Sequence, residues 1–165
     1  MKFCYLDESG LGEEPFAIMV GIIVDSQRMH ITKNEWLEKL TMLKKLTNCK
    51  INELHTKCLY RGKGVYRNLQ GDKRANFITD ILKWLKDRKH HISFCGLDKK
   101  LFKADKNNNN YLKDIKSYWC MLALHQILII QKSFQHFKGN KGNTVMIFDE
   151  VVKEYTKFCK LILKF

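Results

Sequence analysis

Alternating apolar and polar stretches predict the strands and helices of this chain. Residues 2–6 and 16–24 are rich in β-branched and aromatic residues, and the loop between them contains glycines and a proline. They predict a β-hairpin. The second run is almost continuously apolar, as is typical of a strand buried on both faces. A short buried helix has the same pattern, but the length of the run and Gly21 favour a strand.

Apolar residues at helical spacing predict two helices after the hairpin. Thr32 and Glu35 have the spacing of a capping box, and the following pattern predicts a helix over 33–47. Asp72 is placed to cap a second helix, whose apolar positions form one stripe. Residues 48–71, between the two helices, are basic and interrupted by glycines, so we expect a long surface loop there.

The second half of the chain predicts two more strands and two more helices. We expect a strand over 91–97, a mobile loop over 103–110, a helix over 111–137, a strand over 144–148 and an amphipathic helix over 150–165. The resulting order is ββααβαβα, with no repeat and no domain boundary. This order predicts one α/β domain over 1–165, with helices packed on a mixed sheet.

Composition is that of an ordinary globular protein. Hydrophobic residues make up 45% of the 165 residues and charged residues 28%, which argues against a disordered chain or a membrane protein. The longest apolar segment, 118–130, is shorter than the roughly 20 residues that cross a bilayer. The apolar run before Asp7 is too short for a signal peptide, and the six cysteines form no C-x-x-C pair. We therefore expect a cytoplasmic protein with free thiols and no membrane association.

The formal net charge of +13 is unevenly distributed. Residues 39–74 contain ten lysines and arginines against Glu53 and Asp72, a density that attracts phosphate. A nucleic acid is the natural partner of such a segment, although a lysine-rich solvated surface has the same composition. The candidate phosphate-binding residues are Lys57, Arg61, Lys63 and Arg67.

Two predicted strands are followed by the same acidic dipeptide, Asp7-Glu8 and Asp149-Glu150. Parallel neighbouring strands bring their C-terminal ends together, so Asp7 and Asp149 are candidates for one site. Two adjacent carboxylates repel each other unless a cation or a shared proton relieves them, and hard oxygen ligands suit Mg²⁺ or Mn²⁺. Either dipeptide alone has a simpler interpretation, in which an acidic residue turns the chain or caps the next helix.

Tyr5-Leu6-Asp7-Glu8-Ser9-Gly10, followed by an apolar strand that contains glycine, resembles the opening motif of the domain of unknown function 3800 family. That family is grouped with ribonuclease H-like folds. Glu53-Leu54-His55 is similar to its Glu-x-His element, and Asp149 to its later strand-terminal aspartate. The resemblance implies a ribonuclease H-like mixed sheet and a metal-dependent nuclease. Its catalytic metal ligands would be Asp7, Glu53 and Asp149, with Glu8, His55 and Glu150 as accessory residues.

Two functions remain open at this point. Members of that family usually continue through a further helical segment with another aspartate, whereas this sequence ends at Phe165. One function is hydrolysis of DNA or RNA by a site that binds Mg²⁺ or Mn²⁺. The other is a non-catalytic module with the same fold that binds nucleic acid or a protein. The sequence lacks both the P-loop motif and the G-x-G-x-x-G motif, which argues against nucleotide hydrolysis by a P-loop and against a dinucleotide cofactor.

Overall fold

The computed structural model describes residues 1–135, 143–148 and 158. Contacts within the chain group it into two compact units, which are described separately. Unit 1 combines Met1–Asp25 with His91–Phe165, and unit 2 is the intervening segment Ser26–His90. A single ribonuclease H-like domain over 1–165 stays a prediction.

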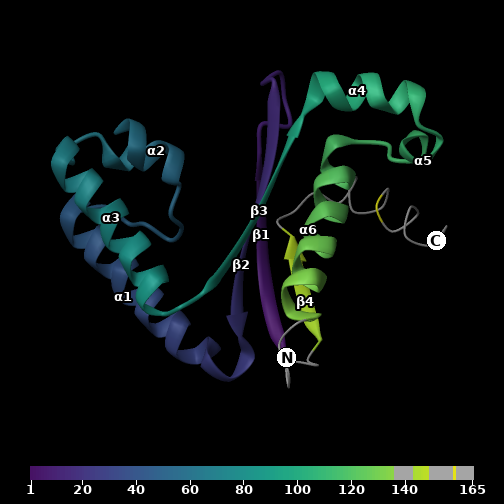
Figure 1. The fold of residues 1–165 in the computed structure, drawn as a ribbon. Coiled ribbons are helices and arrows are strands. Elements are labelled where there is room, and N and C mark those ends of the chain that lie inside the picture. Colours follow the sequence, from purple (N-terminus) through teal and green to yellow (C-terminus); the bar gives the residue numbers. More distant parts are fainter. Residues whose placement is uncertain (136–142, 149–157, 159–165) are drawn as a thin grey trace. The chain divides into compact units, whose positions relative to one another are not determined.

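A four-stranded mixed sheet forms the centre of unit 1 (Figure 1). Its strands are β1 (Lys2–Ser9), β2 (Phe16–Asp25), β3 (His91–Asp98) and β4 (Thr144–Phe148), in the order β3-β2-β1-β4. β2 is antiparallel to both β1 and β3, whereas β4 is parallel to β1. The predicted hairpin and the predicted mixed α/β architecture are therefore confirmed. The ribonuclease H-like topology stays a prediction.

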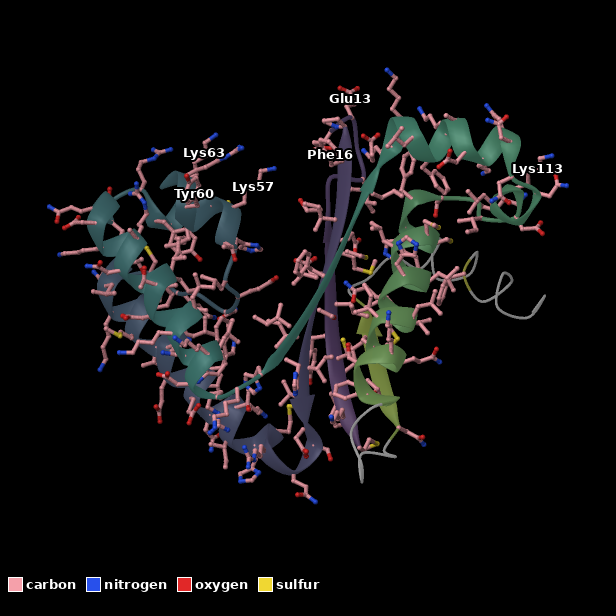
Figure 2. The ribbon with its side chains drawn as sticks, viewed as in Figure 1. Glu13, Phe16, Lys57, Tyr60, Lys63 and Lys113 are labelled. Carbon is pink, nitrogen blue, oxygen red and sulfur yellow. The ribbon has the colours of Figure 1, made fainter. Side chains whose placement is uncertain are left out.

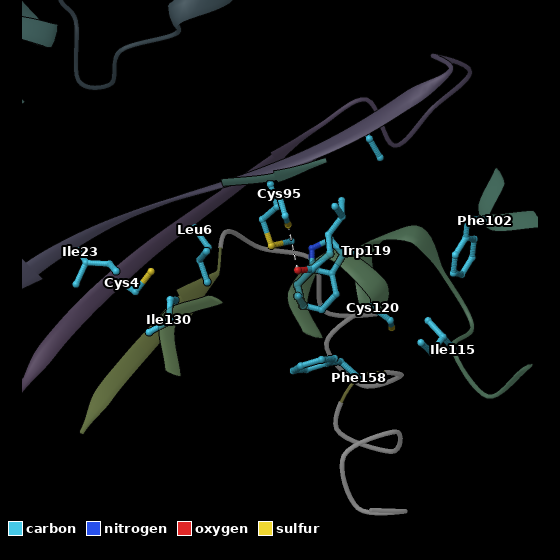
Figure 3. Close-up of a cluster of buried hydrophobic side chains, with 14 residues drawn as sticks. Cys4, Leu6, Ile23, Cys95, Phe102, Ile115, Trp119, Cys120, Ile130 and Phe158 are labelled. Atoms are coloured by element: carbon cyan, nitrogen blue, oxygen red, sulfur yellow. Dashed lines mark hydrogen bonds between the residues drawn. The ribbon is translucent and has the colours of Figure 1, made fainter. Parts of the chain in front are cut away.

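One face of this sheet packs against α6 (Tyr118–Gln135). Alternate residues of β1 and β2, including Cys4, Leu6 and Met19, are buried there in one cluster with Trp119 of α6 (Figure 3). The Trp119 ring lies 4.9 Å from that of Phe148 and 5.7 Å from that of Phe158, measured between centroids. Hydrophobic burial against α6 therefore stabilises the strands from one side.

The second strand is buried on both faces only near its C-terminal end, where the successive residues Ile23 and Val24 are both buried. Over the rest of the strand the prediction of burial on both faces is wrong. Ala17, Met19 and Ile23 are buried against the α6 side, whereas Ile18 and Val20 point to the other face and are exposed. The run is continuously apolar because the sheet has apolar side chains on both faces. From Phe16 to Val20 only one face is buried, which gives an alternation that the sequence does not show.

The segment that leads into α6 is helical, so the prediction of a mobile loop over 103–110 is wrong. It forms α4 (Lys99–Asn108) and α5 (Asn110–Lys113). The Asp98 carboxylate caps α4 by accepting hydrogen bonds from the amides of Lys100 and Leu101, at 2.9 and 3.1 Å. The helix predicted over 111–137 accordingly begins only at Tyr118. The helix predicted over 150–165 lies outside the described residues, except for Phe158, which is helical and buried.

Unit 2 consists of helices around a second buried cluster. The elements are η1 (Ser26–Arg28), α1 (Met29–Thr47), α2 (Thr56–Arg61), η2 (Gly64–Tyr66) and α3 (Gly71–Asp87). The expected long loop over 48–71 is wrong, because this segment contains α2 and η2. It folds because four of its apolar residues are buried with residues of α1 and α3, namely Ile51, Leu59, Tyr66 and Leu69.

Both predicted helix caps in unit 2 are also wrong. The helix predicted from residue 33 begins at Met29, and the Thr32 hydroxyl donates a hydrogen bond back to the Arg28 carbonyl at 3.2 Å. The N-cap of α3 is Gln70, so Asp72 lies inside the first turn. Asp72 can still interact favourably with the helix dipole, but it does not cap the helix.

Candidate functional site

Asp7 lies within a strand and not beyond its end. β1 continues to Ser9, so the prediction that the first strand ends at Leu6 is wrong. The extension follows from strand pairing, because Asp7 and Glu8 are opposite Val20 and Met19 of β2. The hydrogen-bonding partner keeps the acidic residues extended, although their intrinsic strand propensity is low.

Gly10 ends this acidic motif with a sharp turn. Its φ of 75° lies in the left-handed region, and a Cβ on this residue would collide with the carbonyl of Phe16. Glycine adopts this conformation without steric cost. The glycine of the Tyr5–Gly10 motif therefore has a structural role in closing the β1–β2 hairpin.

The two acids of the motif point to opposite faces of the sheet. Successive side chains of a strand alternate, so Glu8 shares the α6 side with Leu6, and Asp7 shares the other face with Tyr5. Asp7 is exposed, and its Oδ1 accepts a hydrogen bond from the Glu8 amide at 2.9 Å. Of this dipeptide, Asp7 alone is placed to hold a ligand on that face, and an accessory role for Glu8 stays a prediction.

β4 runs beside β1 in the same direction. Tyr5 pairs with Ile147 and Leu6 with Phe148. Leu6 and Phe148 both belong to the cluster against α6, whereas Tyr5 and Ile147 are both exposed, so the register and the two faces agree. The next residue of the sequence after each member of the last pair is an aspartate. Asp149 and Glu150 themselves lie outside the described residues.

The neighbours of Asp7 across the sheet are apolar. Val20 of β2 is directly opposite Asp7, and Phe94 of β3 is opposite Val20. Both side chains are exposed. Neither can neutralise the Asp7 carboxylate, so Asp7 carries its charge beside apolar neighbours on this face.

Glu53 and His55 lie in unit 2, just before α2, and both are exposed. Beneath them Tyr66 is buried, and burial raises the pKa of its phenol. The His55 backbone opposes this rise in pKa, whereas Cys58 and Glu53 add to it. Glu53 therefore lies near a phenol that stays neutral. Its predicted role as a metal ligand with Asp7 stays a prediction.

The described residues contain no group of three or more histidines, cysteines, aspartates and glutamates arranged to hold a metal ion. Of the two ligands predicted in unit 1, Asp7 is described and Asp149 is not. A carboxylate oxygen exposed to solvent is a suitable ligand for Mg²⁺ or Mn²⁺, which retain several water ligands. Asp7 therefore fits such an ion as one ligand of an incompletely described set.

The four predicted phosphate-binding residues lie close together along unit 2. Lys57 and Arg61 are on α2, and Lys63 and Arg67 follow it. All four side chains are exposed. Tyr60, which was not among the predicted site residues, lies between Lys57 and Lys63 (Figure 2) and is 76% exposed. An aromatic residue within a basic segment is the signal that identifies it.

Comparisons of the chain with protein-family models, with curated proteins and with solved structures found no match. The resemblance to the domain of unknown function 3800 family therefore stays a prediction. In the part of the chain that the structure describes, no helix has the length and apolar character needed to cross a bilayer.

Proposed function

We propose that this protein is a metal-dependent nuclease in which Asp7 and Asp149 bind Mg²⁺ or Mn²⁺. The observation that carries the proposal is the parallel pairing of β1 with β4, in which Leu6 is opposite Phe148 and each is followed by an aspartate. Residues paired in parallel strands share a face of the sheet. Continuation of this register by one residue would bring the two carboxylates to the exposed face that carries Asp7.

The chemistry of this pair supports phosphodiester hydrolysis. A bound divalent ion supplies a Lewis acid for a phosphoryl oxygen and lowers the pKa of a bound water. The role of Asp7 would be to hold and orient the ion, because its carboxylate is exposed and its backbone is paired with Val20 of β2. Lys57, Arg61, Lys63 and Arg67 would bind the phosphates of the nucleic acid chain.

Isothermal titration calorimetry with Mn²⁺ tests the metal site directly. Asp7→Asn keeps the shape of the side chain and removes its charge, so we expect it to abolish Mn²⁺ binding. Glu13→Gln is the matched control, because Glu13 is an exposed acid of the same unit in the β1–β2 loop. Equal Mn²⁺ affinity of the wild type and Asp7→Asn would refute the site.

A cleavage assay tests the second ligand and the reaction. Asp149→Asn should abolish Mn²⁺-dependent cleavage of DNA, RNA or hybrid substrates while circular dichroism and nucleic-acid binding stay unchanged. Losing one metal ligand should remove transition-state stabilisation on the order of several kcal/mol. Cleavage at the wild-type rate by a folded Asp149→Asn protein would exclude this carboxylate as a ligand.

The exposed basic segment favours a second candidate function, a nucleic-acid-binding module without catalysis. Such binding depends on counterion release, so affinity should fall steeply as salt increases. Replacing Lys57, Arg61, Lys63 and Arg67 together by alanine should flatten this dependence. A wild-type protein that binds nucleic acid but cleaves no substrate would favour the binding module over the nuclease.

A further inference from the structure

Tyr60 is the most exposed of the large hydrophobic side chains in the described residues, at 76%. The residue before it, Leu59, is fully buried and anchors α2 in the core of unit 2. Tyr60 therefore projects from a helix that is fixed to the core, while its own ring contributes little to burial. An exposed tyrosine ring offers a flat apolar surface to a partner.

Backbone hydrogen bonds on both sides of Tyr60 hold the main chain in place. The Leu59 amide donates to the His55 carbonyl at 2.9 Å. After the helix, Gly62 has a φ of 62°, and its amide donates to the Leu59 carbonyl at 3.1 Å. The Lys63 amide donates to the Cys58 carbonyl at 2.9 Å. This is a helix-terminating motif, so the position of Tyr60 is fixed before any partner binds.

The charged residues that neighbour Tyr60 along the chain are all positive. Lys57 and Arg61 flank Tyr60 on the same side of α2, because residues at i, i+3 and i+4 share a helix face. Lys63 follows two residues after the helix (Figure 2). Residues 54–71 contain four lysines and arginines and no acid. None of these four side chains forms a salt bridge with a carboxylate of the described residues.

We propose that Tyr60 is a stacking platform for an unpaired base, and that the basic residues around it bind the adjoining phosphates of a single-stranded nucleic acid. A base has a free face for a protein ring only where it is not stacked within a duplex. DNA and RNA share this chemistry. This inference rests on the proposed function, from which it takes nucleic acid as the substrate. It narrows that substrate to single strands.

Fluorescence anisotropy with the full chain in EDTA measures binding without cleavage. The probes are labelled 20-nucleotide single strands of oligo(dT) and oligo(U), and a 20-base-pair DNA duplex. Tyr60→Ala should weaken single-strand binding about 5- to 150-fold, which corresponds to the roughly 1–3 kcal/mol of one base stacked on an aromatic side chain. It should leave duplex affinity unchanged, because the phosphate contacts remain. Tyr60→Phe retains the ring and should bind like the wild type.

Two controls separate stacking from charge and from a general loss of apolar surface. Phe16→Ala removes another exposed aromatic ring, 56% exposed on β2, and should have no effect on binding. Lys57→Ala with Lys63→Ala should reduce the salt dependence of binding to all three probes, whereas Tyr60→Ala should leave it unchanged. Circular dichroism confirms that each variant is folded.

The inference is overturned if Tyr60→Ala binds single strands like the wild type, or if it loses single-strand and duplex affinity equally. It is also overturned if the wild type binds none of the probes. The same holds if poly-glutamate displaces the bound single strands when its concentration of negative charges equals that of the nucleic acid. If the proposed metal site is wrong, the result is different: the protein binds the single strands in EDTA but does not cleave them in Mn²⁺. Cleavage of duplexes by Tyr60→Ala at the wild-type rate, with unchanged single-strand binding, would support the nuclease and refute the stacking platform.

Discussion

Gly21 of β2 lies at a crowded point of the sheet in unit 1. A Cβ added there would meet the Ser93 Oγ at 2.7 Å, the Cys4 Sγ at 2.9 Å and the Leu6 Cδ2 at 2.9 Å. All three neighbours are buried, so they have little room to move. The sequence indicates a strand at this position, but the lack of space for a side chain depends on residues of two other strands.

We predict that Gly21→Ala lowers the free energy of unfolding by about 1–3 kcal/mol, because the added methyl overpacks the core. Gly96→Ala is the matched control in the neighbouring strand, since its Cβ would have only the Ala17 carbonyl oxygen nearby, at 4.0 Å. That change should be neutral or slightly stabilising. Urea denaturation followed by circular dichroism measures both variants. A Gly21→Ala protein as stable as Gly96→Ala would contradict the packing described here.

Helix ends differ from the sequence prediction more than any other feature of the fold. The spacing of Thr32 and Glu35 and the position of Asp72 both predict caps, yet neither residue caps its helix. Asp98, which the sequence analysis left at the edge of a predicted strand, caps α4 with two hydrogen bonds. A short side chain near a helix start is a cap only if the backbone turns at that residue, and tertiary packing determines where it turns.

Substitution of the two aspartates should cost different amounts of stability, which one experiment can compare. Asp98→Ala should cost about 0.5–2 kcal/mol in the free energy of unfolding, because two amides of α4 lose their acceptor. Asp72→Ala should cost less, about 0.3–1 kcal/mol, because it removes only an interaction with the helix dipole. Urea denaturation of both variants gives the ranking. A larger loss for Asp72→Ala would show that the sequence pattern identified the true cap.

Strands were predictable where an apolar run is bounded by turn residues. The observed β3 and β4 match their predicted ranges to within one residue. The extension of β1 through Asp7 was not predictable from its composition, because pairing with β2 keeps the acids extended. The helices within 48–71 were missed for a related reason. Glycines at 62, 64 and 71 interrupt this segment, and the burial of residues such as Leu59 and Tyr66 depends on packing against α1 and α3.

The acidic residues of the candidate site stand out in the sequence, whereas their geometry does not. The repeated Asp-Glu dipeptide identified Asp7 as an exposed acid beside a parallel strand. That Asp7 and Glu8 point to opposite faces follows only from the register of β1 and the position of α6. The role proposed for Tyr60 rests on the exposure of its side chain, because a tyrosine in an unassigned basic segment is equally compatible with a core position such as that of Tyr66.

At the scale of the whole molecule, each unit has its own hydrophobic core. The cluster of unit 1 packs α6 against the sheet, and that of unit 2 joins α1, α2 and α3. Unit 2 is inserted between β2 and β3, whose ends lie close together, since Ile23 is paired with His91. A segment that leaves and re-enters a sheet at adjacent points can unfold without separating the strands that flank it.

We therefore predict that a core mutation in one unit changes hydrogen exchange in that unit alone. Leu43→Ala removes a fully buried side chain of α1 and should destabilise unit 2 by about 2–5 kcal/mol. Native-state hydrogen exchange by mass spectrometry should then show faster exchange in α1 and α3, with unchanged protection in β1 and β2. Leu122→Ala, the equivalent change in α6, should give the reverse pattern. Equal acceleration of both units by either variant would show that they unfold as one cooperative structure.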